Sequence, residues 1–249
     1  FNDPGNLNAM SYEQMAEFND FLNLVRYDKD CRVIVLTGEG KSFCAGFNLN
    51  DLFLDPPEDM GRIQRDFYVM QRMCSDQVLN MAKCEQPIIG ALKGFAVGGG
   101  LSIATACDMR ILGESFKMNA GYLSIGYTGT DMSGSFYLPK IVGYARACEI
   151  LMNRAASRLR PSLSGAMQSR SFRMRKLWKK QSSWLRKSAA RLLRSVCVLP
   201  RKHSRARSTV LSLADQVKME KPQPGSRCNT QDAYWGMQKM NPKEPRRGQ

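Results

Sequence analysis

The sequence predicts an α/β fold for its N-terminal 154 residues. Apolar residues recur at helical intervals in some segments, and short β-branched runs that end near glycines form others. Because the two kinds of segment alternate along the chain, we expect helices and strands packed in layers around one core. The chain has 249 residues, 43% of them hydrophobic, and is long enough to bury such a core without disulfides or metals.

A helix and a strand are predicted first. Ser11 and Gln14 have the spacing of a capping box, which marks the start of a helix. Apolar residues then recur every three or four positions as far as Arg26, namely Met15, Phe18, Leu22 and Val25. Residues 31–37 form a β-branched run that ends at Gly38, which predicts a buried strand.

Two more helices and two more strands follow. Residues 63–81 place apolar side chains at helical spacing after a pair of prolines, which predicts a second helix. Residues 87–92 predict a strand, and residues 98–106 predict a short helix that opens with glycines. Residues 109–113 predict a third strand. The alternation of strand and helix therefore continues through this part of the chain.

Two glycine-rich turns follow two of the predicted strands. One contains Ala45, Gly46 and Phe47, and the other contains the triplet at residues 98–100. Backbone N–H groups from two such turns, aimed at a common point, form an oxyanion hole that stabilises charge on a carbonyl or thioester oxygen. Tight packing of a strand against a helix is the alternative reason for a glycine triplet.

Four motifs follow one another within residues 1–149. They are N-D-P-G-N-L-N-A-M, R-V-I-V-L-T-G-E-G-K-S-F-C-A-G-F-N-L, Q-P-I-I-G-A-L-K-G-F-A-V-G-G-G-L-S-I-A-T-A-C-D-M-R and L-P-K-I-V-G. With these motifs, the chain resembles the enoyl-CoA hydratase/isomerase (crotonase) family. The resemblance implies a crotonase-like spiral of ββα repeats with a helical C-terminal region. It also implies lyase or isomerase activity on an acyl-CoA thioester of fatty acid metabolism, with coenzyme A as part of the substrate and with no separate cofactor and no metal.

The resemblance also implies an oxyanion hole at the two turns. It assigns the backbone N–H groups of Phe47 and Gly99 to this hole, where they hold an enolate. The neighbouring residues Ala45, Gly46 and Gly98 are then expected in the substrate-binding turns.

The resemblance departs from the hydratases at their two glutamates. This chain has Ser102 and Tyr122 at those positions, so we expect both in the substrate site but neither as a carboxylate base. Asp131 lies where dienoyl-CoA isomerases and aromatic acyl-CoA members have a catalytic aspartate, and it is the candidate for proton transfer. The alternative is that Asp131 caps the following helix. A family member that binds coenzyme A without turnover is a second alternative.

Composition divides the chain into three parts. Residues 1–154, the crotonase-like core with its first strand expected to be partly missing, have a net charge of −4. The rest of the chain has a net charge of +19, and residues 150–214 contain no acidic residue. We interpret residues 155–208 as an anomalous basic segment rich in serine and arginine, and residues 209–249 as a remnant of the family's helical C-terminal region.

A shifted reading frame explains the basic segment. When the codons are read from their third base, the codons of Trp178 and Lys179 encode glutamate. Residues 170–187 permit an acidic, family-like helix sequence in the same shifted frame. The alternatives are a disordered basic tail and an arm that binds RNA or an anionic membrane. Because the family uses this region for assembly, we expect an aggregate or a monomer from the chain as written, instead of the homotrimer or dimer of trimers usual in the family.

Cysteine and histidine usage restrict the remaining possibilities. The eight cysteines never form C-x-x-C and lie mostly within apolar patterns, which favours a reduced protein in the cytoplasm or the mitochondrion. The longest nearly apolar stretch, residues 88–107, contains Lys93 and five glycines, so we expect no membrane span. The one histidine is His203, which excludes a histidine-centred triad or zinc cluster from the N-terminal part.

Overall fold

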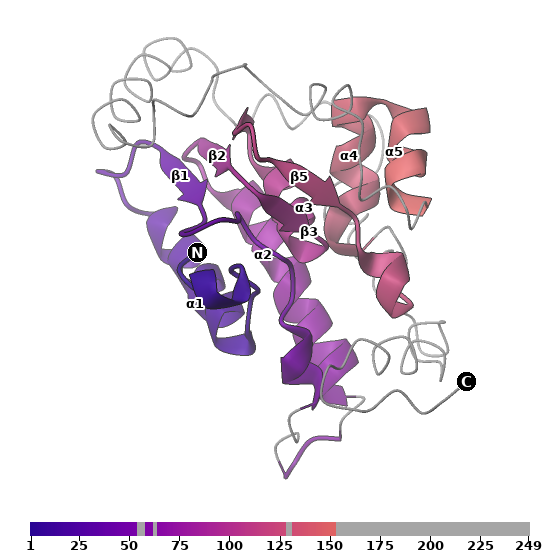
Figure 1. Cartoon of the computed structure of the whole chain (residues 1–249). Coiled ribbons are helices and arrows are strands. Elements are labelled where there is room, and N and C mark those ends of the chain that lie inside the picture. The colour runs from indigo at the N-terminus through magenta and orange to yellow at the C-terminus, as the bar shows by residue number, and fades with distance from the viewer. Residues whose placement is uncertain (54–57, 62–63, 128–130, 153–249) are drawn as a thin grey trace.

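The computed structural model describes residues 1–53, 58–61, 64–127 and 131–152 (Figure 1). The predictions for residues 155–208 and 209–249, including the shifted reading frame, lie outside these described residues. Within them the chain alternates helices and strands, as predicted. Four short 3-10 helices accompany the longer elements, namely η1 (Pro4–Asn6), η2 (Leu49–Phe53), η4 (Tyr122–Ile125) and η5 (Asp131–Ser133).

Helix α1 (Tyr12–Val25) begins at the predicted capping box. The backbone N–H of Gln14 donates to Ser11 Oγ, and the backbone N–H of Ser11 donates to Gln14 Oε1, each over 3.2 Å. These bonds satisfy two N–H groups that a helix start would otherwise leave unpaired. The apolar face of α1 is buried at Met15, Leu22 and Val25.

The second predicted helix consists of two parts in the structure. A π-helical segment, η3 (Gln64–Met70), leads directly into α2 (Gln71–Lys83). The two parts differ in hydrogen-bond register, which is i to i+5 in the first and i to i+4 in the second. Apolar spacing does not distinguish these registers over one or two turns, so the sequence predicts a single helix here.

Three parallel strands form the larger sheet, in the order β1–β2–β4. They are β1 (Ile34–Thr37), β2 (Ile88–Leu92) and β4 (Met109–Leu112). All three are predicted, but β1 begins three residues later than expected. The carboxylate of Asp28 accepts the N–H groups of Asp30 and Cys31, over 2.8 and 3.3 Å, and this turn precedes the strand.

A second row of strands repeats the order of the first. Strands β3 (Phe95–Val97) and β5 (Lys117–Asn119) pair in parallel, and Cys44 forms an isolated parallel bridge to Ala96 in β3. Each of the strands β1, β2 and β4 is therefore followed by an extended segment of the second row. This is the ββα repeat that the resemblance implies. Three-residue strands are too short to show a period of two, so the sequence does not predict β3 and β5.

Helix α3 (Gly99–Ala106) follows β3 and is buried along its whole length. Helices α4 (Gly134–Val142) and α5 (Tyr144–Met152) lie side by side, across the sheets from α1 (Figure 1). The core lies between these helices and the strands, where residues such as Leu22, Ile88 and Ile103 have no exposed surface.

Candidate functional site

The turn after β1 is held from two sides. The Cys44 amide donates to Phe95 O over 3.0 Å, which ties the turn to β3. Beyond it, the Met10 amide donates to Gly46 O over 2.7 Å. The carbonyl of Gly46 and the N–H of Phe47 belong to one trans peptide group, so they point in opposite directions. The N–H of Phe47 therefore points away from Met10.

Gly46 brings this turn against the next one. Its φ is +97°, a conformation that other residues rarely adopt. A Cβ atom at this position would lie 2.7 Å from Val97 O and 3.5 Å from the Gly99 amide nitrogen. The two glycine-rich turns that the sequence analysis identified are therefore in direct contact.

The second turn leads into helix α3. Gly98 has φ +51° and ψ −120°, and its carbonyl accepts the first hydrogen bond of the helix, from the Ser102 amide over 3.1 Å. The N–H of Gly99 precedes that bond and has no partner within the helix. A Cβ at Gly100 would overlap the carbonyl oxygen of Cys44, so only glycine permits this approach.

Two backbone N–H groups are thus left without a partner in adjacent turns. Within the part of the chain that the structure describes, neither Phe47 nor Gly99 donates its backbone N–H to any hydrogen bond. Gly99 is buried and Phe47 is partly buried, and unpaired N–H groups at buried positions are unusual in proteins. The positive end of the α3 dipole adds to the attraction that this point offers to a negatively charged oxygen.

Two methionines that the sequence analysis did not identify pack against Gly99. A Cβ at this glycine would lie 3.0 Å from Met132 Sδ and 3.2 Å from Met10 Cε. Both methionines are buried, so they wall the site on this side. Methionine is common in cores, and nothing in the sequence distinguishes these two from the other thirteen.

The predicted base Asp131 begins η5, and its side chain lies outside the described part of the structure. The next two residues, Met132 and Ser133, have φ values of +51° and +70°, and strained backbone of this kind clusters at functional sites. Because Met132 contacts Gly99, the main chain of Asp131 is one residue away from the candidate site. Ser133, and not Asp131, occupies the N-cap position of α4.

Ser102 and Tyr122 come together although they are twenty residues apart. Their hydroxyl oxygens lie 2.7 Å apart in a buried hydrogen bond between α3 and η4. Only 2% of Ser102 and 6% of Tyr122 is exposed. The two positions expected in the substrate site are therefore adjacent, and here they pair with each other.

The thiol of Cys44 is not a nucleophile. Burial raises its pKa to about 12, although the N–H of Gly46 donates to Sγ over 3.4 Å and opposes the shift. The thiol therefore stays protonated at neutral pH, whereas nucleophilic cysteines need a thiolate. Cys44 therefore has a structural role, because its buried side chain packs inside the turn.

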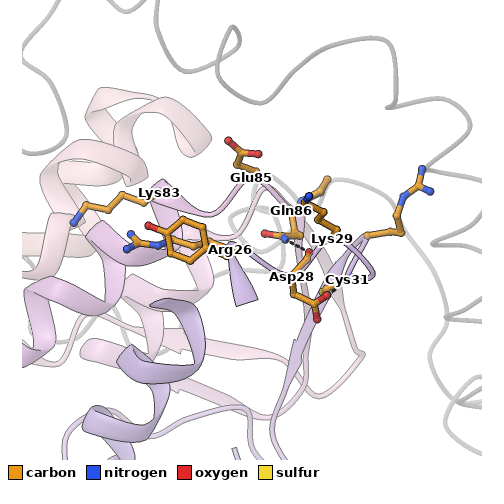
Figure 2. Close-up of a pocket in the computed structure, with 10 residues that line it drawn as sticks. Arg26, Asp28, Lys29, Cys31, Lys83, Glu85 and Gln86 are labelled. Atoms are coloured by element: carbon orange, nitrogen blue, oxygen red, sulfur yellow. Dashed lines mark hydrogen bonds between the residues drawn. The ribbon is translucent and has the colours of Figure 1, made fainter. Parts of the chain in front are cut away.

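A separate cavity of about 630 Å³ opens at the other ends of the strands, where residues 26–32 and 83–87 precede β1 and β2 (Figure 2). The labelled charged side chains fan out instead of converging on one point (Figure 2). Lys83 lies in the last turn of α2 and Arg26 caps α1, where positive charge complements the helix dipole. These two charges therefore complement the ends of the helices, and the cavity lies at the opposite ends of the strands from the glycine turns.

The described residues contain neither a metal site nor a membrane-spanning helix. No group of three histidine, cysteine, aspartate or glutamate side chains in this part of the chain is arranged to hold a metal ion. No helix among the described residues is both long and apolar enough to cross a membrane.

Comparisons with known proteins agree with this architecture. The family model described as enoyl-CoA hydratase/isomerase matches residues 1–241. A probable enoyl-CoA hydratase, echA12 of Mycobacterium bovis, is 33% identical over 153 residues, which are 61% of this chain and 53% of that protein. The 4-chlorobenzoyl coenzyme A dehalogenase-2 of an Arthrobacter species is 37% identical over 155 residues, which are 62% of this chain and 55% of that protein. The chain thus spans about half the length of these relatives.

A solved structure shows the same fold. The crystal structure of an enoyl-CoA hydratase from Mycobacterium avium subsp. paratuberculosis matches with a TM-score of 0.75 and 21% identity. The match covers 96% of this chain and 92% of that one. At this identity the likeness is evidence for the fold.

Proposed function

This chain belongs to the enoyl-CoA hydratase/isomerase family, and we propose that it acts on an acyl-CoA thioester through an enolate intermediate. The N–H groups of Phe47 and Gly99 hold the thioester oxygen as it becomes negatively charged. Each donor of this kind contributes roughly 10² to 10³ in rate.

The contact between the two glycine turns is the observation that supports this proposal. The Cβ position of Gly46 lies 3.5 Å from the Gly99 amide nitrogen, and the N–H groups on either side of this contact are unpartnered among the described residues. Because Gly46 has no side chain, the two turns approach closely, which supports a single oxygen atom as the acceptor for both N–H groups.

Asp131 is the proposed proton-transfer group. Once the thioester oxygen accepts two hydrogen bonds, the proton on the adjacent carbon becomes more acidic. The carboxylate of Asp131 takes this proton, the C–H bond breaks, and its electron pair forms the enolate. Return of the proton to a different carbon completes an isomerisation. The position of Asp131 beside the Met132–Gly99 contact supports this role.

Proton transfer is favoured over the addition of water. Water addition needs a base that activates water, and in the hydratases of this family that base is a glutamate. Ser102 and Tyr122 stand at the two glutamate positions, and their hydroxyls bond to each other over 2.7 Å. The names of the two relatives above, a hydratase and a dehalogenase, show that similar chains differ in the reaction they catalyse.

An exchange experiment in D₂O tests the proposal. The full chain is incubated with 3-hexenoyl-CoA, and deuterium at the carbon next to the thioester is measured by mass spectrometry. Hydration of 2-hexenoyl-CoA is followed in parallel through the loss of its ultraviolet absorbance. We expect deuterium exchange to be faster than in buffer alone, and hydration of 2-hexenoyl-CoA to be slower than this exchange. Calorimetric binding of the thioester without exchange would identify a non-catalytic coenzyme A-binding protein instead, and the absence of both binding and exchange would exclude this function.

The oligomeric state is proposed separately from the activity. The family usually forms a homotrimer or a dimer of trimers, but we expect an aggregate or a monomer for this chain, because of the basic composition of residues 155–208. Analytical ultracentrifugation of the full chain measures the oligomeric state, and a well-defined trimer would contradict this expectation. Retention of the chain on RNA that weakens steeply with salt would support the alternative function of that segment.

A further inference from the structure

The peptide group between Gly98 and Gly99 has no side chain on either side. Glycine adopts many backbone conformations at little cost, so local preferences do not fix the direction of the Gly99 N–H. An oxyanion donor depends on that direction, because hydrogen bonds weaken steeply as their angle departs from linearity. Contacts from elsewhere in the fold must therefore hold this peptide group.

We propose that Ser102 and Tyr122 are positioning residues, whose mutual hydrogen bond holds the Gly98–Gly99 peptide in the direction that the oxyanion needs. This inference rests on the proposed function, because it assigns a task to the same Gly99 N–H. It gives the two residues a role that differs from acid–base chemistry.

Ser102 links the hydrogen bond directly to the turn. Its backbone amide donates to Gly98 O over 3.1 Å, which is the carbonyl of the Gly98–Gly99 peptide itself. Its side chain pairs with Tyr122 Oη over 2.7 Å. Rotation of that peptide would therefore break the first hydrogen bond of α3, and movement of Ser102 would break the pair.

Tyr122 links the hydrogen bond to the neighbouring turn. Its Cε1 atom lies 3.8 Å from the Cβ position of Gly98. The residues before it are fixed as well, since the Gly98 amide donates to Asn119 O and the Gly121 amide donates to Asn119 Oδ1, each over 3.0 Å. The Cβ position of Gly121 lies 3.5 Å from the Gly98 amide nitrogen. The segment before Tyr122 is thus held by hydrogen bonds, and the tyrosine ring contacts Gly98.

Burial makes the hydrogen bond effective. Both hydroxyls are almost fully buried, so breaking their bond leaves polar groups that water does not readily reach. A bond of this kind restrains the two elements it joins more strongly than one at the surface. Loss of either hydroxyl should therefore free the turn to a similar extent.

Carbonyl polarisation is the measurement that separates a positioning role from a structural one. The full chain is loaded with hexanoyl-CoA labelled with ¹³C at the thioester carbonyl, and the stretching frequency is measured by infrared difference spectroscopy. The variants are Tyr122→Phe, Ser102→Ala and the double variant. The control is Ser75→Ala, which removes a buried hydroxyl that donates to Gln71 O over 2.8 Å on helix α2.

We expect a downshifted carbonyl in the wild type and in the Ser75→Ala control. Each single variant should lose much of the shift and roughly 10-fold in kcat, with a Kd for the thioester within about 3-fold of wild type. The double variant should match the singles, because either substitution breaks the same bond.

The outcomes separate the two proposals. A wild-type carbonyl without a downshift would overturn the proposed oxyanion hole and this inference with it. A wild-type downshift that both single variants keep in full would overturn the positioning role alone. Tyr122→Phe retains the ring and Ser102→Ala removes one atom, so circular dichroism decides whether each variant is folded before its spectrum is interpreted.

Discussion

Gly46 and the carbonyl oxygen of Val97 lie so close that a Cβ atom on the glycine would be 2.7 Å from that oxygen. The φ of +97° at Gly46 adds a second restriction. Gly46→Ala should therefore destabilise the fold by about 1–3 kcal/mol and push the Phe47 and Gly99 turns apart. We expect a lower denaturant midpoint and at least a 10-fold loss of α-proton exchange.

Gly61→Ala is the matched control, since a Cβ at Gly61 has no atom within 4 Å. It should leave both the midpoint and the exchange rate close to wild type. Equal exchange rates in the Gly46 and Gly61 variants would contradict the assignment of the site to these turns.

Replacement of Asp131 tests the proton-transfer step. Asp131→Asn keeps the size of the side chain but removes the basic carboxylate, so turnover should fall by roughly 10² to 10⁴. Thioester binding, measured by calorimetry, should stay near wild type. Asp76→Asn is the control, because the Asp76 carboxylate pairs only loosely with Arg72, over 4.0 Å at the surface. Full turnover in Asp131→Asn would exclude Asp131 as the base.

Asn8 holds the segment that leads into the first glycine turn. Its side-chain amide donates to Glu39 O and Ser42 O, each over 2.9 Å, and it is 1% exposed. Asn8→Asp would turn both contacts into repulsion between oxygen atoms, while aspartate tolerates the left-handed backbone at this position. We expect a loss of about 3 kcal/mol in the free energy of unfolding, measured by urea titration. The exposed Asn50, changed to aspartate, should cost far less, and similar losses in both variants would contradict this role.

The buried thiol of Cys44 predicts a pH dependence of stability. Its pKa is raised from an ordinary value of 9.0 to about 12 in the folded protein. Between these values the unfolded chain loses the thiol proton while the folded protein keeps it, so the free energy of unfolding falls as pH rises. The slope from this group is at most about 1.4 kcal/mol per pH unit.

Cys44→Ala should remove that part of the slope above pH 9. The control Ile103→Val deletes one buried methyl group and introduces no titrating side chain, so it should lower stability by a constant amount at every pH. Identical slopes in wild type and Cys44→Ala would show that the thiol does not titrate in this way.

The sequence predicted most of the long elements well, with the exception of α5 (Tyr144–Met152), and the short ones poorly. The capping box at Ser11 marks a helix start by local hydrogen bonding, so this prediction does not depend on tertiary contacts. Residues 31–37 also predicted a strand correctly, although β1 begins only at Ile34. Strands β3 and β5 have three residues each and depend on partners far away in the chain.

The candidate site was predictable only in part. Glycines at 46 and 98–100 are visible in the sequence because left-handed backbone and close approach require them. Their contact with each other comes from the parallel bridge between Cys44 and Ala96, which no local pattern encodes. The packing of Met132 on Gly99 depends on an unusual backbone conformation, which a methionine in the sequence does not predict. The roles of the sequence-predicted site residues stay predictions.

The parallel sheet also affects the order in which the protein assembles. The β1–β2 pair brings together Thr37 and Ala91, 54 positions apart, whereas the contact between Ile88 and Asp108 beside the β2–β4 pair spans only 20. Closing the shorter loop costs less chain entropy. We therefore expect β2 and β4 to pair early, around the helix that carries Gly99. Strand β1 would join afterwards, so the two halves of the proposed oxyanion hole would meet only at a late stage of folding.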